Sequence, residues 1–358
     1  MHRDRSRPRP VVLIGVATLA ASVLISAAPP PGPPEPAVPR DDRVRIAEAF
    51  RLADRIGDGI WRGWSKVPFA LVLVTPETEF FIRHPSPPAD ARPIGRDALG
   101  TELRAVEQPD ATVYARPRTF PPNLLATFPV EGVSTVVVGQ QANTTSNSPT
   151  DWVVTLLHEH FHQLQESLPG YYDRVTALGL ARGDKTGMWM LNFPFPYGAQ
   201  AVDAAYRPAA QTLRDALRGG SWSSYLDKRA ALRALLSKDD LAYFDFQLWK
   251  EGVARYTQLR VAEWAAARGD PPADFRALPG FVPYATVARA LAAAIPEELS
   301  GLELSDAKRS VVYPYGAAEA LLLDRERPCW KDVYFARLFT LAPGFEAKDC
   351  GGKPAGRG

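Results

Sequence analysis

Cysteine is scarce in this 358-residue chain, and its basic and acidic residues are nearly equal in number. Both facts exclude some classes of protein. There are only two cysteines, Cys329 and Cys350, and their spacing from each other and from the histidines fits no zinc motif. Lys and Arg total 42 against 40 for Asp and Glu, so the basic excess that is typical of nucleic-acid binders is missing. We therefore expect neither a cysteine-based zinc site nor a nucleic-acid partner.

The first 40 residues are expected to lie outside the folded domain. Four arginines in "MHRDRSRPRP" precede an uncharged apolar run over residues 11–28, which predicts that residues 1–28 are a signal peptide or an N-terminal membrane anchor. The run is about the minimum length for a bilayer span, and both outcomes stay open. Residues 29–40 predict a stiff Pro-rich linker. We expect an extracytoplasmic protein (secreted, periplasmic or tethered through residues 11–28) with a disulfide between Cys329 and Cys350.

The remaining chain, residues 41–358, has an ordinary globular composition, with 46% hydrophobic and 23% charged residues in the whole sequence. Helical periodicity covers residues 41–62, and strand patterns follow at 69–75, 78–84, 111–117 and 133–140. Helical segments dominate afterwards. The sequence therefore predicts one α+β domain that is β-rich over about 65–147 and mainly helical over 148–358.

Three of the five histidines fall within the pentapeptide "HEHFH", residues 158–162. The flanking residues predict a helix over about 149–168, with Ser148 as its N-cap and a stop before a Pro-Gly pair. On a helix His158 and His162 lie one turn apart on the same face and can bind one zinc ion. Glu159 then lies beside the metal, where it can take a proton from water; this is the H-E-x-x-H pattern. His160 points to the opposite side and is not expected to be a ligand.

A third protein ligand has to come from elsewhere in the chain. One long form of the pattern requires Gly at position 165 and His at 168, but Gln165 and Leu168 stand there. Glu166 shares the ligand face, yet it lies eight residues from His158, about 12 Å along the helix axis.

The best candidate is Glu251 in "LWKEGVARY", within a helix predicted from a cap at Ser237 to about Arg268. Its apolar neighbours would make an unpaired carboxylate costly, and coordination would offset that cost. Gly252 inside this helix costs about 1 kcal/mol relative to Ala. We expect close approach to the histidine-bearing helix to account for this glycine.

"HEHFH" followed far downstream by "EGVARY" resembles the gluzincin metallopeptidases. That resemblance implies a zincin-like fold, in which a β-sheet region precedes the active-site helix and a mainly helical part follows. It implies Zn²⁺ as the cofactor, with His158, His162 and Glu251 as ligands, Glu159 as general base and a peptide or protein as substrate. It also implies that the substrate lies along a sheet edge.

The segment "VVYPYGAAEALLLD" is similar to the Y-x-x-G segment of the aminopeptidase branch of this group. The similarity implies that Tyr313 hydrogen-bonds the developing oxyanion, with Tyr315 and Tyr256 as competitors. Two features depart from known branches. No G-x-M-E-N segment, which anchors a free amino terminus, precedes the histidines. Arg255 stands four residues after Glu251, where thermolysin-like enzymes have a histidine-orienting Asp.

Together these patterns predict an exported zinc-dependent hydrolase, most consistent with a gluzincin metallopeptidase. Two other classes remain open. One is a zinc-binding protein without hydrolytic activity, and the other is a membrane-tethered interaction domain without a metal. Zinc content and activity on peptides separate the three.

Overall fold

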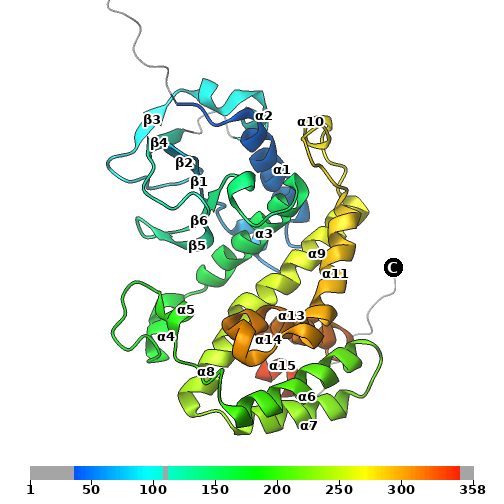
Figure 1. The fold of residues 1–358 in the computed structure, drawn as a ribbon. Coiled ribbons are helices and arrows are strands. Elements are labelled where there is room, and N and C mark those ends of the chain that lie inside the picture. The colour runs from blue at the N-terminus through cyan, green and yellow to red at the C-terminus, as the bar shows by residue number, and fades with distance from the viewer. Residues whose placement is uncertain (1–35, 108–111, 347–358) are drawn as a thin grey trace, which may run out of the picture. The chain divides into compact units, whose positions relative to one another are not determined.

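A single mixed sheet organises the first part of the chain in the computed structural model, which describes residues 36–107 and 112–346 (Figure 1). In this part of the chain the strands are β1 (Leu71–Val74), β2 (Thr78–Ile82), β3 (Arg92–Ile94), β4 (Val113–Pro117), β5 (Leu125–Val130) and β6 (Val133–Gly139). Their order in the sheet is β3-β4-β2-β1-β6-β5. β1 and β6 are parallel, and the other neighbours are antiparallel. β5 is therefore an edge strand.

The two faces of the sheet bury different sets of side chains. Leu71 and Leu73 point into the main hydrophobic core, which also contains side chains of α1 and α3. Val72 and Val74 alternate with them and join a smaller cluster on the other face, with Phe81 at its centre. Figure 1 shows α1 and α3 beside the sheet, and these two helices pack against each other. The sheet thus holds α3, the histidine-bearing helix, on its larger buried face.

α1 precedes the sheet and α2 lies between two of its strands, and the other helices follow the last strand in a mostly unbroken series. Over the described residues they are α1 (Arg40–Ile56), α2 (Gly100–Arg104), α3 (Pro149–Glu166), α4 (Tyr171–Ala177), α5 (Trp189–Asn192), α6 (Gln200–Leu217), α7 (Trp222–Ala234), α8 (Lys238–Gln247), α9 (Val253–Arg268), α10 (Ala273–Arg276), α11 (Tyr284–Gly301), α12 (Leu304–Ala307), α13 (Val312–Glu326), α14 (Trp330–Tyr334) and α15 (Ala342–Glu346). Short 3-10 turns lie at Trp64–Lys66, Arg96–Leu99, Gln141–Asn143 and Lys308–Val311.

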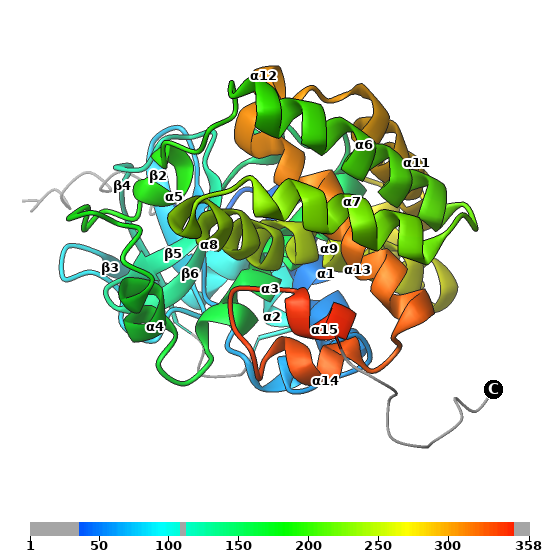
Figure 2. The ribbon, with the colours of Figure 1, turned by 90° about the horizontal axis from the view of Figure 1, so that it is seen from below.

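The helical part is organised around α9. This helix packs against α3 on one side and against α11 and α13 on others, and α6 and α7 cover α13 from outside (Figure 2). A π-helical turn, η4 (Leu248–Gly252), joins α8 to α9 without a break in the helical path. The expected helix from Ser237 to Arg268 is therefore present, but its middle is π-helical, which the sequence pattern did not indicate.

The α+β class and the order of sheet followed by helices are confirmed. The four predicted strands correspond to β1, β2, β4 and β6, whereas β3 and β5 were not predicted. The predicted helix over 41–62 is too long, because Gly57 takes a positive φ of 48° and ends α1 at Ile56. Residues 1–28, most of the linker and Cys350 lie outside the described residues, so the expectations placed there stay predictions. No helix among the described residues is long and apolar enough to cross a bilayer.

Candidate metal centre

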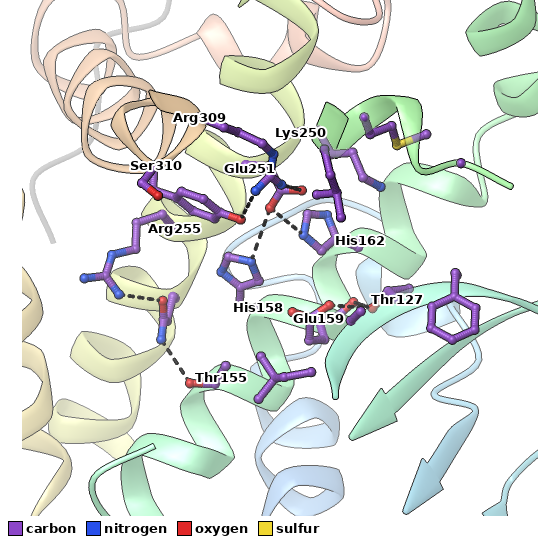
Figure 3. Close-up of a pocket in the computed structure, with 18 of the residues that line it drawn as sticks. Thr127, Thr155, His158, Glu159, His162, Lys250, Glu251, Arg255, Arg309 and Ser310 are labelled. Carbon is purple, nitrogen blue, oxygen red and sulfur yellow. Dashed lines mark hydrogen bonds and ion pairs between the residues drawn. The ribbon is translucent and has the colours of Figure 1, made fainter. Parts of the chain in front are cut away.

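The histidine-bearing helix begins and ends close to the predicted positions. The backbone N–H of Asp151 donates to the Ser148 hydroxyl at 3.0 Å, and Pro149 occupies the first helical position. α3 then runs to Glu166, with His158 and His162 buried on the face that packs against α9. Figure 3 shows both imidazoles directed toward Glu251, which the π-helical turn carries.

The three expected ligands lie together, although Glu251 is 89 residues beyond His162 in the sequence. Glu251 Oε2 is 3.4 Å from His162 Nε2 and 3.9 Å from His158 Nε2. One ligand atom from each residue lies within 4.8 Å of the others. Two donor atoms bound to one tetrahedral zinc ion at about 2.0–2.1 Å would be about 3.3 Å apart. Two imidazole nitrogens and a carboxylate oxygen this close together are a donor set that could hold a zinc ion, and the cleft beside them would leave room for a further ligand.

A glutamine determines which nitrogen of His162 faces the site. Gln165 donates its amide N–H groups to the carbonyls of Trp249 and Lys250, at 3.0 and 3.1 Å. Its Oε1 must therefore face His162 Nδ1, which lies 2.6 Å away and donates to it. In its neutral form His162 then keeps the Nε2 lone pair for a metal. Burial alone would lower the pKa of this histidine, but the neighbouring Glu251 raises it overall, so a metal that binds there displaces a proton. Sequence reasoning missed this residue, although its i,i+3 spacing from His162 could have indicated it.

The protonation states of His158 and Glu251 also suit metal binding. Burial, with the neighbouring His162, lowers the pKa of His158 to about 3, so its imidazole is neutral at physiological pH. Burial alone would raise the pKa of Glu251, but His162 and Arg309 lower it overall, so the carboxylate stays ionised. Both states are those that a zinc ligand requires.

Arg309 holds the outer oxygen of the Glu251 carboxylate. Its guanidinium donates to Glu251 Oε1 at 3.1 Å and leaves Oε2 facing the histidines. The same guanidinium donates to Gln247 Oε1 at 3.2 Å and to the Tyr313 hydroxyl at 3.0 Å. One side chain thus ties Glu251 to Tyr313. Arg309 was not predicted, and its position four residues before Tyr313 is the sequence signal that could have found it.

Gly252 does lie at a close approach of two helices, as expected, but the predicted partner helix is wrong. Gly252 approaches Gly316 of α13, not the histidine-bearing helix. A Cβ at Gly252 would collide with the Gly316 Cα and lie 2.9 Å from the Val312 carbonyl oxygen. The two helices therefore touch backbone to backbone. Since Glu251 precedes one glycine and Tyr313 lies three residues before the other, this contact brings the two side chains together.

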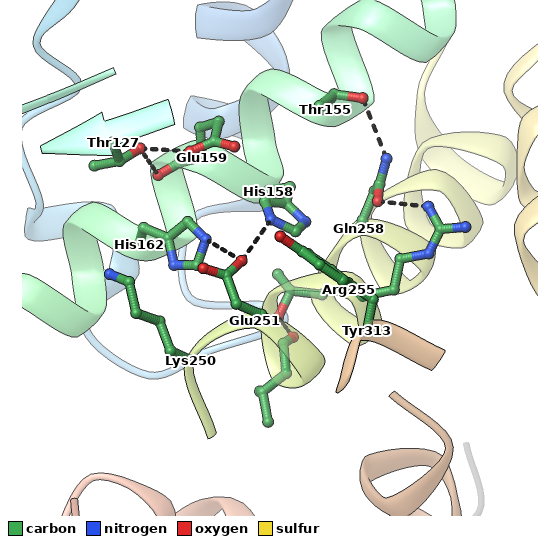
Figure 4. A network of polar contacts seen from close by, with 12 residues as sticks. Thr127, Thr155, His158, Glu159, His162, Lys250, Glu251, Arg255, Gln258 and Tyr313 are labelled. Carbon is green, nitrogen blue, oxygen red and sulfur yellow. Dashed lines mark hydrogen bonds and ion pairs between the residues drawn. The ribbon is translucent and has the colours of Figure 1, made fainter. Parts of the chain in front are cut away.

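Glu159 lies on the sheet side of the site. Its Oε2 accepts a hydrogen bond of 2.8 Å from the Thr127 hydroxyl, and Thr127 belongs to the edge strand β5 (Figure 4). Burial, reinforced by the charge of Glu251, raises the pKa of Glu159 and makes it a better proton acceptor. Thr127 could not be found from the sequence, because no local pattern links residues 32 positions apart.

Among the three tyrosines considered, Tyr313 is the one that reaches the cleft. Its phenol points toward the space beside His158 in Figure 4. Burial and the nearby Glu251 raise its pKa, so the hydroxyl keeps its proton. Tyr315 is buried with its hydroxyl 3.4 Å from that of Tyr225, and the Tyr256 hydroxyl donates to Asp324 at 2.5 Å.

The two side chains that were excluded as ligands have other partners. His160 stacks on Phe69 with ring centroids 4.0 Å apart, and its Nδ1 lies 2.8 Å from Gln163 Oε1. Glu166 forms an ion pair of 3.0 Å with the buried Lys250. Both exclusions made from helical geometry agree with these contacts.

The site opens into a cleft of about 1950 Å³. Its walls come from β5, α3, the segment from Tyr171 to Leu191, α9 and α11, and His158, Glu159, His162, Glu251 and Tyr313 all line it. No family model, curated protein or solved structure matches the chain.

Proposed function

We propose that this protein is an exported zinc-dependent peptidase of the gluzincin type, with a zincin-like fold. The observation that carries the proposal is the approach of Glu251 Oε2 to both imidazoles, at 3.4 and 3.9 Å, with Glu159 beside them in the same cleft. His158, His162 and Glu251 are the proposed zinc ligands. Export rests on residues 1–28 of the sequence.

Each remaining side chain has a role that follows from its position. A bound zinc ion would polarise the scissile carbonyl and lower the pKa of a water molecule. Glu159, held by Thr127, accepts a proton from water and later delivers it to the leaving amine. Tyr313 receives its hydrogen bond from Arg309, so its own O–H is available to an oxyanion in the cleft.

The edge strand β5 offers the substrate a place to pair. The Gly139 N–H donates to the Leu124 carbonyl at 2.8 Å. In an antiparallel pair, Leu124 and every second residue after it therefore point their N–H and C=O groups toward β6. The N–H and C=O groups of Leu125 and Thr127 therefore face the open edge. An extended peptide can add to such an edge through main-chain hydrogen bonds. This would bring its backbone past Glu159.

Two measurements test the proposal. Purified protein should contain about one zinc ion per chain, and His158→Ala should lose it. Glu159→Ala should retain the zinc but lose hydrolysis of a mixed peptide library, since only the general base is removed. If the wild type contains no metal, the membrane-tethered interaction domain is the alternative that remains. If the wild type contains zinc but hydrolyses no peptide, the zinc-binding protein without hydrolytic activity remains.

A further inference from the structure

One wall of the cleft carries an unusual group of exposed apolar side chains. Four large hydrophobic side chains are strongly exposed among the described residues, and three of them line the cleft: Tyr172 at 45%, Met188 at 48% and Leu191 at 51%. The fourth, Leu235 at 48%, does not line it. Exposed apolar side chains that gather at a cleft indicate a binding surface, whereas those without a function are usually scattered singly over the surface.

The exposure of Met188 and Leu191 is imposed by the fold. Trp189, which lies between them, is buried, and its ring packs against Phe246 with centroids 5.4 Å apart. The carbonyl of Met190 accepts hydrogen bonds from Tyr243 at 2.9 Å and from Gln247 at 2.8 Å. The segment is thus anchored at its centre and presents its two flanking apolar side chains to the cleft.

The opposite walls are apolar as well. Leu124 and Leu125 of the β5 side line the cleft, and Val287 and Leu291 line it from α11. The volume of about 1950 Å³ exceeds that of sites for single small molecules, which occupy roughly 300–1,000 Å³. The cleft therefore has room for several consecutive side chains on both sides of the metal centre.

The carboxylates next to the histidines on either helix have no negative charge left over for a free amino terminus. A cationic amine that leaves water needs an unpaired anionic partner. Three of the six carboxylates that line the cleft among the described residues form ion pairs: Glu166 with Lys250, Glu251 with Arg309, and Glu298 with Arg255. The other three accept hydrogen bonds from neutral groups: Asp151 from the N–H of Asn147, Glu159 from Thr127, and Asp184 from Thr186. Of these, Glu159 is the proposed base, and Asp151 lies seven residues before His158, about 10 Å along the helix axis.

We infer that the cleft selects internal, extended stretches of polypeptide with apolar side chains, and that Met188 and Leu191 set this preference. The inference rests on the proposed peptidase function and specifies its substrate. The apolar walls take the side chains, and the ion pairs of Glu166 with Lys250 and of Glu251 with Arg309 leave neither carboxylate free to bind the amino end of a chain.

Peptide pairs test the preference directly. The zinc-loaded protein is given a quenched fluorescent peptide with both ends blocked and with Leu and Phe around the central bond. A second peptide has Ser and Asn there, and a third has the apolar sequence with a free amino end. The blocked apolar peptide should show a kcat/KM at least about 10-fold above the polar one. Equal rates, or cleavage that requires the free amino end, would overturn the inference.

Variants locate the preference in the wall. Leu191→Asn and Met188→Asn should each lower the ratio of kcat/KM for the apolar peptide to that for the polar peptide by roughly 10-fold. Leu235→Asn is the matched control, because Leu235 is equally exposed but lies outside the cleft. An equal loss in the Leu235 variant, or no loss in the wall variants, contradicts the assignment.

Binding separates this inference from the peptidase proposal. Zinc-loaded Glu159→Ala is titrated with the blocked apolar peptide, labelled for fluorescence anisotropy, with and without Leu191→Asn. Weaker binding in the double variant supports apolar recognition, even if the wild type hydrolyses nothing. A wild type that binds the peptide but does not hydrolyse it would refute only the peptidase proposal. Hydrolysis without apolar preference would end the substrate inference alone.

Discussion

The role of Gln165 can be tested against an internal control. Gln165 and Gln163 lie on the same helix, both are buried, and each accepts a hydrogen bond from the histidine three residues earlier, His162 or His160. Each also donates to two backbone carbonyls. Only the Gln165 partner is a proposed zinc ligand. Gln165 also donates to the Tyr334 hydroxyl at 2.7 Å. Apart from that contact, the substitutions Gln165→Met and Gln163→Met remove similar polar contacts.

The expected effects separate metal binding from folding. Each buried polar group that loses its partner costs about 1–3 kcal/mol, so both variants should lose on the order of 3 kcal/mol of metal-free stability. In Gln165→Met, His162 also loses the group that fixes its tautomer and orientation. Removing such a partner typically weakens metal binding by roughly 10–100-fold, or about 1.4–2.7 kcal/mol. Gln163→Met should leave zinc affinity unchanged.

The assays are urea unfolding of the metal-free proteins and zinc competition against a chromophoric chelator. We expect two similar losses of stability and one selective rise in the zinc dissociation constant. If both variants bind zinc equally well, or if both weaken it to the same extent, Gln165 has no specific role in holding His162.

Tyr313→Phe should lower kcat by roughly 100-fold or more and leave zinc content unchanged, because it removes one donor to the oxyanion; an unaltered kcat in steady-state assays would exclude that role. Gly252→Ala should cost about 1–3 kcal/mol in urea unfolding through its collision with Gly316. Gly301→Ala, where an added Cβ meets nothing within 4 Å, is the control and should cost nothing; equal effects contradict the packing argument. Burial lowers the pKa of His160 from 6.5 to about 4, so between these values the folded state binds fewer protons than the unfolded state and stability falls as pH drops. His160→Phe should reduce the fall between pH 7 and pH 4 by about 3 kcal/mol, and an unchanged fall would show that His160 does not drive it.

Local rules were sufficient for the histidine-bearing helix. Ser148 and Pro149 predicted its start, and helical spacing separated His158 and His162 from His160. These features depend on residues within one or two turns of each other, where the backbone geometry is already known. Gln165 was within reach of the same rule.

Contacts between distant segments were not accessible in this way. Thr127 reaches Glu159 from β5, a strand that was missed because its sequence, "LATFPV", contains a proline and lacks clean alternation. Gly252 was recognised as a site of close approach, but its partner Gly316 depends on how the π-helical turn η4 packs against α13. Sequence spacing indicates that a glycine is needed and does not indicate which element it meets.

The π-helical turn at Leu248–Gly252 has a consequence for how this site tolerates insertions and deletions. A π-helical turn contains one residue more than an α-helical turn, so it is equivalent to a single-residue insertion in a longer helix. Deleting one residue there would restore a regular helix, and α8 and α9 would stay close to their present register because the wide turn absorbs the extra residue locally. Lys250 and Glu251 could then no longer face Glu166 and the two histidines together. The length of this turn, as much as the identity of its residues, therefore directs Lys250 and Glu251 toward α3.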